Sequence, residues 1–556
     1  MTTGAGRESL ADLAALLDVP FSLILVVLVV LDVIFVFVIL FVERDNPTRV
    51  LHWLLILIYE PFLGAILFLF FHQDYRRKRR QFEQKARADI EMLERYLRER
   101  VPLRTGSGAA SPTIESATSR GAMSSTSGTV FEYGELARLA SRADPHAVLA
   151  GNNRVRLFVD GNEKFQSLLA DLRAAKEHIH LEYYILRNDA LAKEIVETIS
   201  AKAKAGVLVR LLLDALGGRA MRKLEPLLAG SGVKLAYFFP RVSRFNYRNH
   251  RKIAVIDGRI GYFGGYNIGE EYLGRGPLGY WRDCAVRVQG PGVEQLQIRF
   301  MQDWAFASRE QATNPSPYLQ AVPQNSSAML QQISSGPDTS QEWVKQSYIK
   351  MITMAKESCY IQTPYFIPDA SVIDALRIAA ASGVDVRVMI PCKPDHMFVF
   401  WASQSFCADL LEAGVRSFKY NNGFLHAKTF IVDGKVGSVG SANIDPRSFH
   451  LNFETNVIIF DEAIGGQDER GVPPRRVGLH GTHSARLRQA RLGGPFQGAL
   501  LPALLSDYLN PRTLTSPSLA SSGASTFFSG RTAEPGACSV GNGPRWRGPC
   551  TGHSGS

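Results

Sequence analysis

The chain has 556 residues, several times the roughly 100–200 residues of one domain, so a single small domain is excluded. Hydrophobic residues make up 46% and charged residues 21% of the sequence, which is typical of a mostly globular chain rather than a disordered one. The net charge of +11 favours anionic partners. However, residues 464–556 hold ten Arg, four acidic residues and no Lys, so this tail alone supplies +6. The six cysteines show no C-x-x-C spacing, which excludes a disulfide framework or a cysteine-based zinc site and predicts reduced thiols.

Two long apolar stretches lie near the N-terminus. Residues 21–42 are interrupted only by Asp32, and residues 50–71 contain Glu60. A bilayer core about 30 Å thick needs ~20 helical residues, so both stretches are long enough to span a membrane. A cleaved signal peptide fits poorly, because the first stretch is too long and only Arg7 precedes it as a cation. The sequence therefore predicts two transmembrane helices.

Charged residues indicate how these helices are oriented. Five consecutive basic residues occupy positions 76–80, and basic residues stay on the cytoplasmic side, so we expect a hairpin with the rest of the chain in the cytoplasm. Residues 81–100 look helical and charged on most faces, and residues 104–130 are rich in Ser, Gly and Thr, as in a flexible linker. Asp32 and Glu60 fit a helix–helix contact, and a proton or ion pathway remains the alternative.

A motif then occurs twice. His250-Arg-Lys252 is followed by an apolar strand and Asp257-Gly, and 176 residues later His426-Ala-Lys428 is followed by an apolar strand and Asp433-Gly. Each copy continues with a glycine-containing turn, an asparagine and an acid on an apolar strand. These residues are Gly264, Gly265, Asn267 and Asp283 in the first copy and Gly440, Ser441, Asn443 and Glu454 in the second. A pattern that keeps its order over so many positions indicates an internal repeat.

The segments around each motif alternate between strands and helices. Before the first motif we expect strands at 154–160, 178–186, 207–214 and 233–239 and helices at 162–176 and 189–204. Before the second we expect helices at 341–356, 371–382 and 403–413 and strands at 358–363, 384–391 and 415–420. This alternation predicts an α/β body of two similar halves with a mainly parallel sheet.

Side chains alternate between the two faces of a strand, so the His and Lys of each motif project together. Asp257 and Asp433 have the opposite parity and precede a glycine, which is a hairpin signal. We therefore expect the two aspartates to shape the end of the strand, while a functional role nearby stays open.

The paired residues suit phosphate chemistry. Lysine supplies a point charge for oxyanions, Asn and Ser supply donors, and glycine allows backbone N–H groups to approach. One imidazole can attack phosphorus while the other protonates the leaving alcohol, and an acid from each half can hold a ring in the required tautomer. The candidate catalytic residues are His250, Lys252, Asp257, His426, Lys428 and Asp433; the candidate phosphate-binding residues are Asn267, Ser441 and Asn443; and the candidate His-orienting residues are Asp283 and Glu454.

Other kinds of site find less support. A metal ion fits poorly, because H-x-K offers no second ligand and the lysine repels cations. No P-loop or dinucleotide fingerprint occurs, so no cofactor is expected.

The duplicated H-x-K-x4-D motif resembles the signature of the phospholipase D superfamily. The two-span N-terminus and the phrases Tyr266-Asn-Ile-Gly-Glu-Glu-Tyr272 and Gly440-Ser-Ala-Asn-Ile-Asp-Pro-Arg-Ser448 make residues 20–463 similar to bacterial cardiolipin synthases. The resemblance implies two α/β halves with the active site between them. It also implies phosphatidyl transfer between two phosphatidylglycerol molecules, which gives cardiolipin and glycerol through a phosphohistidine. It further implies His250 as the nucleophile and His426 as the general acid and then base, although the near symmetry of the repeat leaves the reverse order open.

The resemblance also divides the chain. The expected parts are an N-terminal cytoplasmic segment at 1–19, two transmembrane helices at 20–72, a basic helix and linker at 73–130, the first half at 131–310, the second half at 311–463 and an atypical low-complexity tail at 464–556. The family usually continues after Asp461 with a helix that closes the second half, whereas this tail is rich in Gly, Pro, Ser and Arg. A shifted reading frame or a truncated true terminus is our hypothesis for it.

A multi-pass protein of the bacterial inner membrane, acting on phosphatidylglycerol beside other anionic lipids, is therefore expected. A phospholipase D-type hydrolase that uses the same residues with water is the main alternative. A nuclease has no need of a membrane hairpin, and the sequence shows no basic and aromatic strand that would track a nucleic-acid backbone. A non-catalytic membrane scaffold has no use for His, Lys and Asn in both halves.

Overall fold

Both N-terminal apolar stretches contain a helix. The computed structural model describes residues 21–42, 47–60, 63–65, 68, 129, 132–143, 147–239, 247–308, 310, 316–326, 328–339 and 341–460. Helix α2 (Phe21–Val42) covers the whole first stretch, and helix α3 (Pro47–Tyr59) begins before the second and covers its first part. Within the described residues, no helix is identified as both long and apolar enough to cross a membrane. The predicted basic run, the charged helix and the tail lie outside the described residues.

The first half of the α/β body follows the predicted alternation of strands and helices. Its elements are β1 (Ala150–Phe158), α9 (Gly161–Ala174), β2 (His178–Tyr183), α10 (Ala190–Lys204), β3 (Leu208–Asp214), η1 (Arg219–Lys223), η2 (Glu225–Leu228), β4 (Lys234–Phe238), β5 (Arg248–Asn249), β6 (Ile253–Ile256), β7 (Ile260–Gly264), η4 (Glu270–Leu273), β8 (Trp281–Arg282), β9 (Ala285–Gln289) and α11 (Gly292–Ser308). Asp160 and Asp189 cap α9 and α10 by accepting backbone N–H groups of the first turn.

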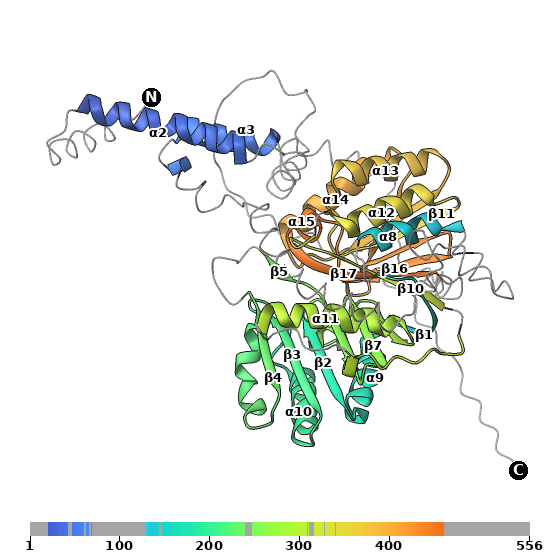
Figure 1. Cartoon of the computed structure of the whole chain (residues 1–556). Coiled ribbons are helices and arrows are strands. Elements are labelled where there is room, and N and C mark those ends of the chain that lie inside the picture. The colour runs from blue at the N-terminus through green and yellow to red at the C-terminus, as the bar shows by residue number, and fades with distance from the viewer. Residues whose placement is uncertain are drawn as a thin grey trace, which may run out of the picture. The chain divides into compact units, whose positions relative to one another are not determined.

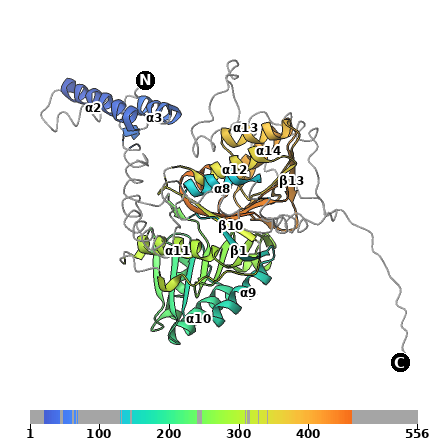
Figure 2. The same ribbon diagram turned by 45° about the vertical axis from the view of Figure 1, so that its right-hand side comes forward.

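The second half repeats this order. Its elements are η5 (Ser316–Tyr318), β10 (Ala328–Ser335), α12 (Trp343–Met354), β11 (Ser358–Gln362), α13 (Ala370–Ala381), β12 (Asp385–Pro391), α14 (Met397–Leu411), β13 (Arg416–Tyr420), β14 (Phe424–Leu425), β15 (Thr429–Val432), β16 (Val436–Gly440), α15 (Pro446–His450) and β17 (Asn452–Phe460). Helix α14 begins six residues before the predicted helix. The prediction missed its first turn because that turn is a continuous apolar run without a helical period. Figures 1 and 2 show α12 and α13 beside the strands of this half and α10 beside those of the first half.

The strands of both halves join into one sheet, and the strand order of one half repeats that of the other in reverse. It runs β13-β12-β11-β15-β16-β17-β10 through the second half and β1-β9-β7-β6-β2-β3-β4 through the first. The prediction of a mainly parallel sheet is wrong. The pairs β2–β3, β3–β4, β11–β12 and β12–β13 are parallel, but the remaining neighbours along the sheet are antiparallel. The reason is that Asp-Gly turns join β6 to β7 and β15 to β16, and tight hairpins connect only antiparallel strands.

The apolar core shows how the halves hold together. Each half has its own buried cluster, and a third cluster combines Ile253, Val255 and Phe263 of the first half with Leu425, Val439 and Val457 of the second. Helix α8 (Gly134–Ala143) precedes β1 and lies within residues 131–310, the range expected to form the first half. It contributes Leu136 and Ala140 to the core of the second half. The body is therefore packed as one unit across the repeat.

Candidate active site

A short parallel strand pair places each motif against the other half. Strand β5, which directly precedes His250, pairs with the start of β17, and the N–H of His250 donates to the carbonyl of Phe453 at 2.9 Å. In the same way β14 pairs with β8, and the N–H of His426 donates to the carbonyl of Arg282 at 2.7 Å. As a result, each histidine lies beside the acid that follows the motif of the opposite half.

His250 is oriented by Glu454. Its Nδ1 lies 3.0 Å from both carboxylate oxygens, and because a carboxylate only accepts, Nδ1 carries the proton. Glu454 also accepts hydrogen bonds from Ser441 Oγ at 2.5 Å and from Asn452 Nδ2 at 3.1 Å, which fixes its position. The ring of Tyr184 packs edge-on against His250 at 4.9 Å between centroids. This tautomer leaves the lone pair of Nε2 for an electrophile.

His426 is oriented by Asp283. Its Nδ1 lies 2.5 Å from Asp283 Oδ2 and 3.3 Å from the hydroxyl of Tyr272. The ring packs against Trp281 at 5.3 Å between centroids. Each half therefore provides the imidazole for one pair and the carboxylate for the other, so neither half alone holds a complete pair.

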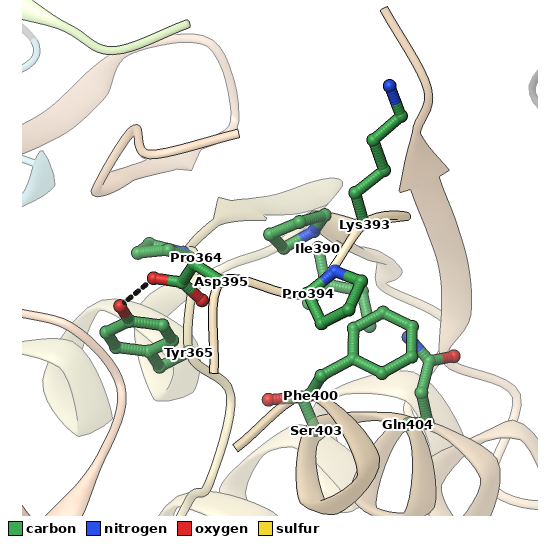
Figure 3. A pocket seen from close by; sticks show the side chains of 10 residues that line it. Pro364, Tyr365, Ile390, Lys393, Pro394, Asp395, Phe400, Ser403 and Gln404 are labelled. Atoms are coloured by element: carbon green, nitrogen blue, oxygen red, sulfur yellow. Dashed lines mark hydrogen bonds between the residues drawn. The ribbon is translucent and has the colours of Figure 1, made fainter. Parts of the chain in front are cut away.

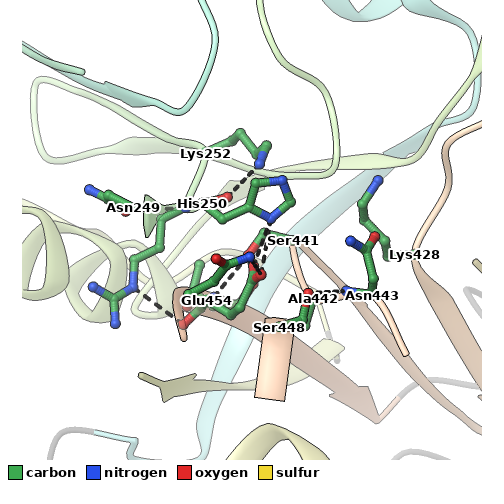
Figure 4. A network of polar contacts seen from close by, with 12 residues as sticks. Asn249, His250, Lys252, Lys428, Ser441, Ala442, Asn443, Ser448 and Glu454 are labelled. Carbon is green, nitrogen blue, oxygen red and sulfur yellow. Dashed lines mark hydrogen bonds and ion pairs between the residues drawn. The ribbon is translucent and has the colours of Figure 1, made fainter. Parts of the chain in front are cut away.

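Two buried lysines complete the positive centre. Lys252 and Lys428 are each 2% exposed. The amino groups of Lys252 and Lys428 donate to the backbone carbonyls of His250 and His426, respectively, and Lys428 Nζ also lies 2.9 Å from His426 Nδ1. In Figure 4, His250 lies between Lys252 and Glu454, while Lys428 and Asn443 stand to one side. The two ammonium groups are suited to bind an anion between the halves.

The protonation of the histidines follows from their surroundings. Burial lowers the pKa of His250 from 6.5 to about 4; Glu454 opposes this shift, and the charges of Lys252 and Lys428 add to it. Burial and the charge of Lys428 lower the pKa of His426 to about 4, while Asp283 opposes this shift and Lys252 adds to it. The charge of each lysine therefore acts on the histidine of the other half as well as on that of its own. Without a bound anion both imidazoles are neutral at pH 7, so the expected split into one neutral and one protonated ring requires the charge of a bound phosphate.

The predicted phosphate-binding residues take different positions. Asn267 accepts from the N–H of Ile185 and donates to Tyr272, which in turn contacts His426. The hydroxyl of Ser441 points at Glu454 and so supports the orientation of His250. The side-chain oxygen of Asn443 is buried and has no hydrogen-bond partner among the described residues, so of the three it is the one with an uncommitted polar atom.

Asp257 and Asp433 lie away from this centre, at the opposite end of β6 and β15 from the histidines. Both residues have φ = 52° in Asp-Gly turns. Asp257 accepts N–H bonds from residues 176–178, and Asp433 accepts them from residues 356–358 and a hydroxyl bond from Tyr133. Their placement in the catalytic set is therefore not supported by the geometry, and they tie the hairpins to the neighbouring strands.

Sequence reasoning missed several residues that shape the site. Arg251 is fully buried, donates to both oxygens of Asp303 at 2.8 and 2.9 Å and reaches the carbonyl of Glu454 at 3.3 Å. Lys164 lies buried over the ring of Phe165, and burial lowers its pKa to about 7 although Asp283 opposes this shift. The only sequence signal for Arg251 is that the equivalent position of the second motif holds Ala427.

Comparison with known proteins adds the family. Residues 168–304 and 348–469 match the family described as “Cardiolipin synthase, PLD-like domain”. The chain is 43% identical over 453 residues to the major cardiolipin synthase ClsA of Bacillus subtilis, a match that covers 80% of this chain and 90% of that protein. It is 41% identical over 443 residues to a cardiolipin synthase of Staphylococcus aureus, covering 78% and 86%. Among solved structures, phosphatidylserine synthase of Haemophilus influenzae aligns with a TM-score of 0.51 at 15% identity, covering 67% of this chain and 97% of that one.

These matches identify the class and then the family. The two-half fold, with one H-x-K motif in each half, is that of a phospholipase D-like enzyme. Within that class, the chain belongs to the cardiolipin synthase family. The family expected from the sequence is thereby confirmed.

Proposed function

We propose that this chain transfers a phosphatidyl group from one phosphatidylglycerol to the free primary hydroxyl of another, giving cardiolipin and glycerol. The observation that carries the proposal is the crossed pair of imidazoles, each held at Nδ1 by a carboxylate of the other half beside two buried lysines. Two such imidazoles suit the exchange of one phosphodiester for another, which needs no energy from a nucleotide.

The first step breaks the bond to the leaving headgroup. Nε2 of His250 attacks phosphorus, and the bond from phosphorus to the glycerol oxygen breaks. His426, protonated under the charge of the bound phosphate, gives its proton to that oxygen, and glycerol leaves. Lys252 and Lys428 stabilise the negative charge that spreads over the equatorial oxygens.

The second step reverses the roles. His426, now neutral, takes the proton of the acceptor hydroxyl, whose oxygen attacks phosphorus and releases Nε2 of His250. Glu454 stabilises the positive charge that His250 carries in the covalent intermediate. The proton lost by His426 in the first step is regained in the second, so the cycle closes without a cofactor.

The test is to supply labelled phosphatidylglycerol to membranes that carry the chain and separate the lipids by thin-layer chromatography. We expect cardiolipin and glycerol in equal amounts without ATP. Phosphatidic acid as the main product would instead identify the hydrolase, the second candidate, because it uses the same residues with water as acceptor. Absence of both products would refute phosphatidyl transfer.

We also propose that residues 20–72 anchor the chain in the bacterial inner membrane, with the catalytic body in the cytoplasm. The apolar stretches, the basic residues at 76–80 and a lipid substrate support this placement. Protease added to sealed vesicles should cut the linker at 104–130 only when the cytoplasmic face is outside. Cleavage in the opposite orientation would overturn the topology.

The pH dependence of attack should reflect the lowered pKa of His250. A phosphatidyl ester of p-nitrophenol needs no general acid, so its kcat/KM depends on neutral His250 alone, and kcat/KM reports the free enzyme. Because the folded pKa is lowered from 6.5 to about 4, neutral His250 persists as the pH falls. We expect kcat/KM to stay level from pH 7 to near 5 and to drop below that; an inflection near 6.5 would contradict the assignment.

Gly265 and Ser441 occupy equivalent positions, but a side chain should be tolerated at only one of them. A Cβ on Gly265 would lie 2.0 Å from Asp283 Oδ1, whereas Ser441 donates to Glu454. We expect Gly265→Ala to displace Asp283 from His426 and to lower kcat about 10²-fold, the scale of losing a ligand-orienting contact. Ser441→Gly is the matched control and should cost less than tenfold, since one hydrogen bond contributes about 1 kcal/mol. Equal kcat values for the two variants would contradict this asymmetry.

A further inference from the structure

The first turn of helix α14 exposes large apolar side chains. Met397, Phe398 and Trp401 are 55%, 63% and 53% exposed. Trp401 lies four residues after Met397 and three after Phe398, so the three share one side of the helix start, while Ala402 and Phe406 bury the other side. An exposed apolar group of this size, including a tryptophan, is unusual on a surface that faces only water.

This helix start is connected to the active site. The preceding residue pair, Asp395-His396, leads into α14, and Asp395 accepts a hydrogen bond from the hydroxyl of Tyr365 (Figure 3). Tyr365 follows Thr363, whose hydroxyl accepts the N–H of Ile444, the neighbour of Asn443. Five residues separate the end of strand β12 from α14, and the carboxyl end of β12 lies at the same end of the sheet as the start of β15, which follows His426 and Lys428.

The first half presents a similar edge. Gly217 packs so closely on Tyr184 that a Cβ there would lie 2.3 Å from its carbonyl oxygen, and Tyr184 packs on His250. Leu216, next to Gly217, is 47% exposed. Several basic residues near these two edges are exposed as well; they are Arg219, Arg222, Lys223 and Lys393.

We propose that Leu216, Met397, Phe398 and Trp401, which we call the apolar rim, insert into the surface of an anionic bilayer and so place the active site against its lipid substrate. The inference rests on the proposed function. Two features favour a membrane over a protein partner. The rim residues follow β3 and β12, whose carboxyl ends lie at the same end of the sheet as the two motifs, and their basic neighbours complement anionic headgroups. Tryptophan is also enriched at the boundary between headgroups and acyl chains.

A rim of this kind has a clear role beside a membrane anchor. An anchor raises the local concentration of the enzyme at the membrane but does not turn its active site toward the lipid. A few apolar side chains of the rim would fix that orientation, because burying them in the bilayer removes apolar surface from water. The rim therefore governs access to lipid in the bilayer rather than the chemical step.

The test compares two forms of substrate for the full chain reconstituted in vesicles. One form is phosphatidylglycerol within the bilayer, and the other is short-chain phosphatidylglycerol dissolved as monomers below its micellar concentration. For M397S/F398S/W401S, the ratio of bilayer to monomer activity should fall at least tenfold relative to the unmodified chain. Ile378 on α13 is 64% exposed, so Ile378→Ser is a matched control that removes an exposed apolar side chain elsewhere and should leave this ratio unchanged.

A direct measurement accompanies the assay. Vesicle lipids brominated in their acyl chains should quench a component of tryptophan emission that is missing in Trp401→Phe. An unchanged ratio without quenching, or an equal loss on both substrates, would overturn the proposal. So would burial of the rim in a dimer, seen as self-association that the triple variant abolishes. If the unmodified chain makes no cardiolipin from either substrate, the proposed function fails, and quenching still decides whether the rim docks on lipid.

Discussion

Replacing His250 by alanine is expected to lower the rate of phosphatidyl transfer at least about 10⁴-fold, the scale seen when a catalytic nucleophile is removed. Glu454 holds Nδ1 of the imidazole at 3.0 Å, which leaves the lone pair of Nε2 for attack on phosphorus. His426→Ala should cause a loss of similar size with phosphatidylglycerol. Measuring cardiolipin formed from labelled phosphatidylglycerol checks both variants.

The leaving group separates the roles of the two histidines. Glycerol is a poor leaving group that requires a proton, whereas p-nitrophenol leaves without one. With a phosphatidyl ester of p-nitrophenol, His426→Ala should still release p-nitrophenol in a burst and accumulate the phosphohistidine, because only attack by His250 is needed. His250→Ala should give neither the burst nor the intermediate.

The same pair of substrates decides between the two orders of reaction. If His426 is the nucleophile, the burst appears in His250→Ala and vanishes in His426→Ala. If either variant keeps its full rate with phosphatidylglycerol, a double-histidine mechanism is excluded. Circular dichroism of both variants checks that a lost rate does not reflect a lost fold.

Much of the fold could be predicted from local pattern. The duplicated motif indicated two halves, and strands such as β3 and β12 stood out as segments rich in apolar residues. The direction of the later strands was harder to predict, because two signals conflict. Each Asp-Gly turn indicates one local antiparallel hairpin, whereas the alternation of strands and helices along the chain suggests a parallel sheet. Helix α8 shows the other limit. Its sequence position suggests the first half, but Leu136 and Ala140 find their apolar partners in the second.

The candidate site was predictable in its residues but not in its pairings. Spacing on a strand placed His250 with Lys252 and excluded Asp257 from their face. Nothing in the sequence showed that Glu454 would reach His250, since they are 204 residues apart and the contact depends on β5 pairing with β17. Arg251 and Lys164 were missed for the same reason, because their roles come from buried contacts that only the packed halves create.

The crossed pairing leads to the second large effect, the exchange of each carboxylate for an amide. Glu454→Gln should lower kcat about 10²- to 10⁴-fold, because the amide removes the charge that stabilises the imidazolium and can also favour the wrong tautomer. Asp283→Asn should act on His426 in the same way. Glu163→Gln is a matched control at an exposed ion pair with Arg156 and should leave kcat unchanged, since exposed pairs contribute little.

The choice of substrate again shows which histidine each acid serves. If the acids cross between halves, Glu454→Gln reproduces the defect of His250→Ala and is slow with both phosphatidylglycerol and the p-nitrophenyl ester. Asp283→Asn then reproduces His426→Ala and recovers with the p-nitrophenyl ester. If each acid instead served the histidine of its own half, the two patterns would be exchanged. A rate of p-nitrophenol release that is unaffected in Glu454→Gln would therefore break the link between Glu454 and His250, and with it the dependence of each half on the other.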